Sequence, residues 1–154
     1  MKDSKDMPGH LARRFQQIAV AVFHAEVDSA GYDLTPVQYA ALSAIAANPS
    51  IDQATLAGLI AYDRTTITGV VDRLVQKSLI ERRKSTKDKR AHELEITADG
   101  TATLQGITPA VETAQQMMLS GLTPSEIEEL MRLLRKLTDA GNELSRAPMR
   151  TSDG

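Results

Sequence analysis

The hydrophobic period of the chain changes just after residue 77 and becomes helical again after residue 97, and the first of these changes constrains the fold more than any other feature. Before it, four apolar residues recur at helical spacing: Ile67, Val70, Val71 and Leu74. After it, the short segments 79–83 and 92–96 have the character of strands, and they flank the polar loop 84–91. The pattern therefore predicts a helix followed directly by a two-stranded hairpin. Since two strands are not stable alone, we expect the hairpin to lie against neighbouring helices.

Capping residues indicate where most of the helices begin. Thr35-Pro36-Val37-Gln38 and Thr123-Pro124-Ser125-Glu126 have the spacing of a capping box, with proline at the first helical position. Asp52, Asp63 and Thr97 are further N-cap candidates. With the apolar spacing, these caps predict helices over about 10–30, 36–48, 52–60, 63–77, 98–118 and 124–144.

The two short helices in the middle of the chain are close enough to form a helix-turn-helix. Only Ala61-Tyr62-Asp63 separates them, and the small residues Ala57 and Gly58 would let them cross closely. A hairpin that follows such a pair at once is typical of a winged helix-turn-helix. The predicted fold class is mainly α with a small β-hairpin, a winged helix-turn-helix that carries additional helical arms.

The distribution of charge indicates an anion-binding surface. The net charge is −2, but the segment 82–90 holds six Lys or Arg residues against one Asp. In a winged helix-turn-helix the second helix enters the major groove of DNA, and a basic wing can reach an adjacent minor groove. We therefore expect double-stranded DNA as a partner. The candidate DNA-binding residues are Arg64, Thr65, Thr66, Thr68, Arg73, Lys87, Asp88, Lys89 and Arg90. Asp88 is expected to orient the Arg90 side chain by a charge-assisted pair.

The apolar stripes outside this region predict a homodimer. One such stripe consists of Leu11, Phe15, Ile18 and Val22, and others follow residues 97 and 123. The winged region does not need three further amphipathic helices, so a second copy of the chain would cover them. We expect residues 1–34 and 98–146 to form the dimerisation region, 35–97 the DNA-binding lobe, and 147–154 a flexible tail. Two lobes related by symmetry predict an inverted-repeat operator.

Two segments resemble the MarR family of transcriptional regulators. The run from Asp88-Lys89-Arg90 through Leu94-Glu95-Ile96-Thr97 to Gly100 is similar to the family's wing signature, and residues 63–74 are similar to its recognition helix. Ser78-Leu79-Ile80 departs from the usual Gly-Leu-Ile in its first residue. The resemblance covers roughly residues 10–145. It implies a homodimeric regulator, usually a repressor, that a small molecule releases from DNA.

The resemblance also implies an effector site between the arms and the DNA-binding lobe. Residues 34–39 and 61–66 are similar to family members that regulate aromatic-acid catabolism, which implies an aromatic acid or its coenzyme A thioester as effector. Arg13 or Arg14 could bind a carboxylate, with His10, Gln17 and Tyr39 nearby. The alternative is that both arginines pair with acidic groups and that Tyr39 is part of the core.

Other classes of function find little support in the sequence. The chain has no cysteine, which excludes disulfides and thiol sensors, and its three histidines are not spaced as zinc ligands. It has no phosphate-binding loop or nucleophile elbow, so no catalytic residue, metal or cofactor is expected, and the protein is not expected to be an enzyme. No apolar run is long enough to span a bilayer, so we expect a cytoplasmic location and no membrane partner. Two alternatives stay open: a DNA-binding protein without an effector, and a helical module that binds an acidic protein.

Overall fold

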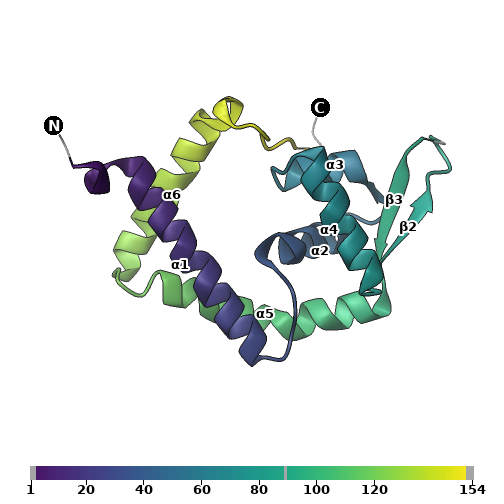
Figure 1. Ribbon diagram of the computed structural model, residues 1–154, viewed down its shortest axis with the longest axis horizontal. Coiled ribbons are helices and arrows are strands. Elements are labelled where there is room, and N and C mark those ends of the chain that lie inside the picture. The colour runs from purple at the N-terminus through teal and green to yellow at the C-terminus, as the bar shows by residue number, and fades with distance from the viewer. Residues whose placement is uncertain (1–2, 89, 152–154) are drawn as a thin grey trace.

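The computed structural model describes residues 3–88 and 90–151 and consists of six α-helices with one small sheet (Figure 1). The helices are α1 (Pro8–Ser29), α2 (Pro36–Ala47), α3 (Gln53–Leu59), α4 (Arg64–Gln76), α5 (Ala98–Met118) and α6 (Pro124–Ala140). The strands are β1 (Ile51–Asp52), β2 (Ile80–Lys84) and β3 (His92–Ile96), and short 3-10 turns occupy Ser4–Asp6 and Asn142–Leu144. None of the helices in the described ranges is long and apolar enough to cross a membrane.

The predicted helix starts are confirmed by hydrogen bonds at their caps. The side chains of Thr35 and Thr123 each accept a hydrogen bond from the backbone N–H three residues on, and both capping boxes are complete. Asp52, Asp63 and Thr97 accept equivalent bonds at α3, α4 and α5. The order α3, α4, β2, β3 within a mainly helical chain confirms the predicted winged helix-turn-helix fold.

The sheet has three strands, so the expectation of a two-stranded hairpin is wrong in one respect. Its order is β1-β3-β2, all antiparallel, and Ile51 of β1 lies opposite the fully buried Leu94. A strand of two residues is too short to show an alternating pattern, which is why the sequence does not reveal it. The added strand joins the wing to the start of α3.

The core lies within the winged region and extends into the arms. It is formed by large fully buried residues of α2, α3, α4 and the sheet, among them Leu42, Ile45, Leu56, Ile67, Leu74 and Leu94. The predicted buried face of α4 is confirmed, since Ile67, Val70, Val71 and Leu74 are all buried. This packing turns the opposite face of α4 to solvent.

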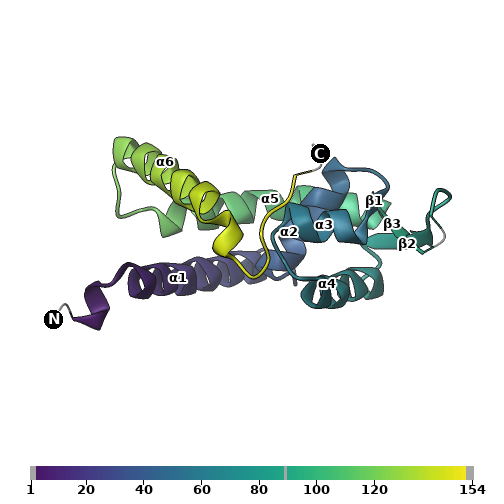
Figure 2. The same ribbon diagram turned by 90° about the horizontal axis from the view of Figure 1, so that it is seen from above.

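The arms leave much of their apolar surface uncovered. Helices α1 and α5 pack on each other, and Phe23 and Val27 of α1 are buried. The predicted α1 stripe faces elsewhere: Leu11 is 52% exposed and Ile18 47% exposed. Helix α6 has no buried residue along its described length, and Figure 2 shows it standing apart from α1.

The C-terminal segment returns to the winged region. Residues 147–151, expected to form part of a flexible tail, run back to α3 (Figure 1). The expectation that Gly58 lets α3 and α4 cross closely is wrong, because a Cβ added there would lie 2.9 Å from Cβ of Arg150. The glycine makes room for the tail.

Ser78, which stands where the resembled pattern has glycine, adopts a left-handed backbone conformation. Ser78 has φ 60°, a conformation that costs a non-glycine residue about 1–2 kcal/mol. Its carbonyl accepts a hydrogen bond from Oγ1 of Thr97 at 2.7 Å, and a Cβ on Gly100 would clash with Leu79 O, so the backbone here is closely packed.

We therefore expect Ser78→Gly to raise the free energy of unfolding by about 0.5–1 kcal/mol, after the entropy cost of glycine. Urea denaturation at one fixed protein concentration measures the change. Ser43→Gly, inside α2, is the matched control and should destabilise by a similar amount. A loss of stability in Ser78→Gly would contradict this account.

Candidate nucleic-acid interface

The exposed face of α4 carries the residues that the sequence singled out. Its buried face anchors the helix, and Asp63 caps it by accepting the Thr66 N–H at 2.8 Å. The candidate residues of α4 are all exposed: Arg64, Thr65, Thr66, Thr68 and Arg73. A Cβ on Gly69 would meet nothing within 4 Å, so this face is open for a close approach.

The three threonines of this face differ in how their hydroxyls are used. Thr66 donates to Oδ2 of Asp63 at 3.0 Å, within the cap. Thr68 donates to the Arg64 carbonyl at 2.9 Å and accepts from Nε2 of Gln53 at 3.1 Å. Within the described ranges, the Thr65 hydroxyl has no such bond. Thr65 is therefore the threonine whose hydroxyl is free to reach a partner.

The cap at the start of α4 holds its carboxylate ionised. The backbone N–H and then the hydroxyl of Thr66 lower the pKa of Asp63, and the charge of Arg146 contributes in the same direction. Because both carboxylate oxygens already accept hydrogen bonds from Thr66, Asp63 acts on the helix and is not a contact residue.

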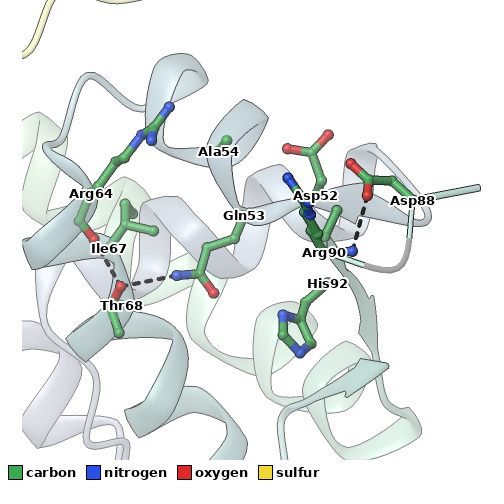
Figure 3. A pocket seen from close by; sticks show the side chains of 10 residues that line it. Asp52, Gln53, Ala54, Arg64, Ile67, Thr68, Asp88, Arg90 and His92 are labelled. Atoms are coloured by element: carbon green, nitrogen blue, oxygen red, sulfur yellow. Dashed lines mark hydrogen bonds between the residues drawn. The ribbon is translucent and has the colours of Figure 1, made fainter. Parts of the chain in front are cut away.

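The tip of the wing is organised by Ser85 and Asp88. Oγ of Ser85 accepts from the backbone N–H groups of Lys87 and Asp88 and donates to Glu93 at 3.0 Å. Asp88 accepts the backbone N–H of Arg90 at 3.0 Å (Figure 3). The expectation that Asp88 pairs with the Arg90 guanidinium is therefore wrong, because its bond goes to the Arg90 backbone. Lys87 and Arg90 are exposed, and Lys89 lies outside the described residues.

Helix α4 and the wing enclose a groove of about 360 Å³. Its lining comes from α3, α4 and the wing and includes Gln53, Arg64, Thr68, Arg90 and His92 (Figure 3). Gln53 and His92 were not among the predicted contact residues. The only sequence signal for Gln53 is its place directly after the Asp52 cap, and this does not reveal that it faces α4.

Two of the basic residues in the wing are neutralised by neighbouring carboxylates. Arg82 forms an ion pair with Asp72 of α4, and Arg83 with Glu95 at 3.1 Å. The pKa of Glu95 is lowered by the Ser50 hydroxyl first and by Arg83 second. The pair between Arg82 and Asp72 joins β2 to α4. These two arginines therefore maintain the wing, whereas Lys87 and Arg90 are exposed basic residues at its tip.

A single protomer does not bring the five predicted ligand-binding residues together. Nη2 of Arg13 lies 3.1 Å from Nδ1 of His10, on the exposed N-terminal half of α1. Tyr39 packs against Phe23 with ring centroids 6.1 Å apart, and Phe23 follows Arg14 by nine residues, about 13 Å along a helix. No hydrogen bond or ion pair of the described residues involves Arg14 or Gln17 side chains.

Comparison with known protein sequences identifies similar regulators. The MarR family model matches residues 34–92. The chain is 29% identical to the HTH-type transcriptional repressor NicR of Pseudomonas putida over 90% of this chain and 86% of that protein. It is 33% identical to a putative transcriptional regulatory protein for the hcr operon of Thauera aromatica, over 85% of this chain and 80% of that protein.

Two solved structures share the fold over nearly their whole length. One is the PcaV transcriptional regulator of Streptomyces coelicolor in complex with its natural ligand: 31% identity, TM-score 0.83, 92% of this chain and 98% of that one. The other is BpsR of Bordetella bronchiseptica, which is 29% identical with a TM-score of 0.84. The match covers 90% of this chain and 98% of BpsR. The BpsR structure concerns regulation of DNA binding by 6-hydroxynicotinic acid.

Proposed function

The chain belongs to the MarR family of DNA-binding transcriptional regulators, which are not enzymes, and on this premise we propose that it is a homodimeric repressor released from its operator by an aromatic acid. The operator is an inverted repeat. In this proposal residues 35–97 bind DNA, while 1–34 and 98–146 form the dimer. The observation that carries the proposal is the groove between the open face of α4 and the wing.

Each group on this surface has a distinct role in binding DNA. Helix α4 lies in the major groove, where Arg64, Thr65 and Arg73 reach base edges or phosphates. Thr66 and Thr68 shape the helix surface through their internal bonds. Lys87, Lys89 and Arg90 bring positive charge to the neighbouring minor groove, and Asp88 holds the turn that presents them.

The dimer rests on the uncovered apolar surface of the arms. A second copy packed against the α1 stripe and α6 buries side chains such as Leu11, Ile18 and Leu137, the last of which is 67% exposed in the protomer. Two copies of α4 then lie about one DNA turn apart.

Selection of binding sites from a random duplex library tests this proposal. The full chain should enrich an inverted repeat whose half-site centres lie about 10 base pairs apart. Sedimentation should show a dimer. A helical module that binds an acidic protein would enrich no DNA sequence. A protein that binds DNA without regard to sequence would enrich no inverted repeat. Either result contradicts the proposal.

The proposed effector site rests on the basic residues near the N-terminus of α1 and on the similarity to PcaV and BpsR, whose structures concern a natural ligand and 6-hydroxynicotinic acid, respectively. Arg14 supplies a guanidinium for a carboxylate, with Arg13, His10, Gln17 and Tyr39 contributing once the dimer is assembled. The pocket then adjoins the arms, which are tied to α4 by the ion pair between Lys77 and Asp33 at 3.4 Å. Because α2 packs against both α4 and α5, a ligand that shifts the arms is expected to shift α4 as well.

Thermal shift with 6-hydroxynicotinic acid, benzoic acids and their coenzyme A thioesters tests the effector. A stabilising compound should also release the selected operator. If every compound that stabilises the protein leaves operator binding unchanged, the chain binds DNA without an effector, which is the alternative that the sequence leaves open.

The wing turn provides a test of how Asp88 acts. Asp88→Ala should weaken operator binding by about 3–10-fold, because one backbone hydrogen bond of the turn is lost. Asp88→Asn keeps the acceptor oxygen and removes a negative charge, so it should bind at least as tightly as the wild type. Fluorescence anisotropy with the selected duplex measures both. Equal loss in the two variants would instead indicate that the charge of Asp88 orients Arg90.

A further inference from the structure

The C-terminal tail lies against the DNA-binding lobe of its own protomer. After the turn at Asn142–Leu144 the chain crosses to α3, which both views show (Figures 1 and 2). The backbone N–H of Arg150 donates to the Gly58 carbonyl at 2.7 Å. The tail is thus joined to the first helix of the helix-turn-helix.

Several specific contacts determine the path of the tail. The Asn142 side chain donates to the Met149 carbonyl at 3.0 Å and accepts the Met149 N–H at 2.8 Å. Arg150 forms an ion pair with Glu143. At Gly58 the absent side chain leaves the space that Arg150 occupies. These bonds hold residues 145–151 as a strap between α6 and α3.

The strap places a basic residue, Arg146, beside the proposed DNA-binding surface. Arg146 is exposed, and both of its chain neighbours line one cavity together with Ala61, two residues before the α4 cap. In line with this placement, the charge of Arg146 helps to lower the pKa of that cap, Asp63. Within the described ranges Arg146 takes part in no ion pair, whereas Arg150 is engaged with Glu143. The free charge of the strap is therefore that of Arg146, which the strap carries beside the turn that precedes α4.

We propose that the strap, residues 145–151, extends the DNA-binding surface, with Arg146 contacting a backbone phosphate beside the major groove that α4 enters. Arg150 anchors the strap and does not contact DNA. This inference rests on the proposed function. A lone arginine on a solvent-exposed strap adds charge without reading bases, so it should contribute affinity that depends on salt and not on sequence.

The salt dependence of binding tests the contact. In the full chain, Arg146→Gln should weaken binding by roughly 2–10-fold at low salt for both the selected operator and a random duplex of equal length. The slope of log affinity against log salt concentration should fall by about 0.9, the value for one phosphate contact. Arg135→Gln, an equal charge change on the exposed face of α6, should leave the slope unchanged.

The anchor provides an independent variant. Gly58→Ala favours the α3 helix, but its Cβ displaces Arg150, so it should lower the slope as Arg146→Gln does. The double variant should lose no more than either single variant, because both remove one contact. An unchanged salt slope or tighter DNA binding in Arg146→Gln would overturn the inference. So would a double variant whose loss of affinity equals the sum of the two single losses. If the wild type selected no operator, the proposed function would fail instead.

Discussion

Replacing Ile18 by aspartate is expected to convert the protein to a monomer and to lower operator affinity by on the order of 10³-fold. Ile18 lies on the uncovered α1 stripe and is 47% exposed in the protomer. In a twofold dimer the substitution buries an unpaired carboxylate on each side of the interface, and the desolvation of each costs several kcal/mol. The single DNA-binding lobe of a monomer then contacts one half-site and loses the affinity that the second half-site contributes.

Sedimentation and anisotropy on the same samples measure this effect. Gln16→Glu adds the same charge two residues away on a different side of α1 and should remain a dimer that binds DNA normally. Circular dichroism should report that the winged region stays folded, since Ile18 is not one of the buried core residues. An Ile18→Asp variant that stays dimeric would exclude the α1 stripe from the interface.

The second large effect concerns release by the effector. A ligand that lowers operator affinity 100-fold must prefer the released conformation by about 2.7 kcal/mol. An Arg–carboxylate pair removed from solvent, with a buried ring, is sufficient for this. We expect Arg14→Ala to abolish release, because the Arg13 guanidinium already contacts His10. Its operator affinity without ligand should stay within a few-fold of the wild type.

Calorimetry with the compound found by thermal shift checks this expectation. Arg13→Ala is the matched comparison: because the Arg13 guanidinium already contacts His10, its loss should weaken release by less than Arg14→Ala does. Linkage requires saturating operator to weaken ligand binding by the same factor as the ligand weakens operator binding. A normal response in Arg14→Ala, or equal ligand affinity with and without operator, would contradict the placement of the site.

The regular elements could be predicted because their signals are local. A cap such as Asp63 or Thr97 satisfies N–H groups within three residues, and the buried face of α4 follows from spacing alone. The wing was predictable for the same reason, since its strands flank one polar loop. Lys89, a predicted DNA contact, lies outside the described residues and stays a prediction.

The bonds across the candidate surface could not be predicted, because they join residues far apart in the chain. Gln53 meets Thr68 only once α3 and α4 are packed, and Arg82 meets Asp72 only once β2 lies beside α4. The Asp88 carboxylate could have paired with the Arg90 side chain or its backbone, and the geometry of the turn decides between them.

By itself, then, the sequence determined where the helices and wing strands lie, which face of α4 is buried and where basic residues gather, because these depend on neighbours a few residues apart. The tertiary structure decided which of those basic residues form ion pairs within the protein and which stay available to a partner. It uses Arg82 and Arg83 in ion pairs, adds β1 to the sheet and docks the tail on Gly58. These outcomes depend on how elements distant in sequence pack together, which no local pattern records.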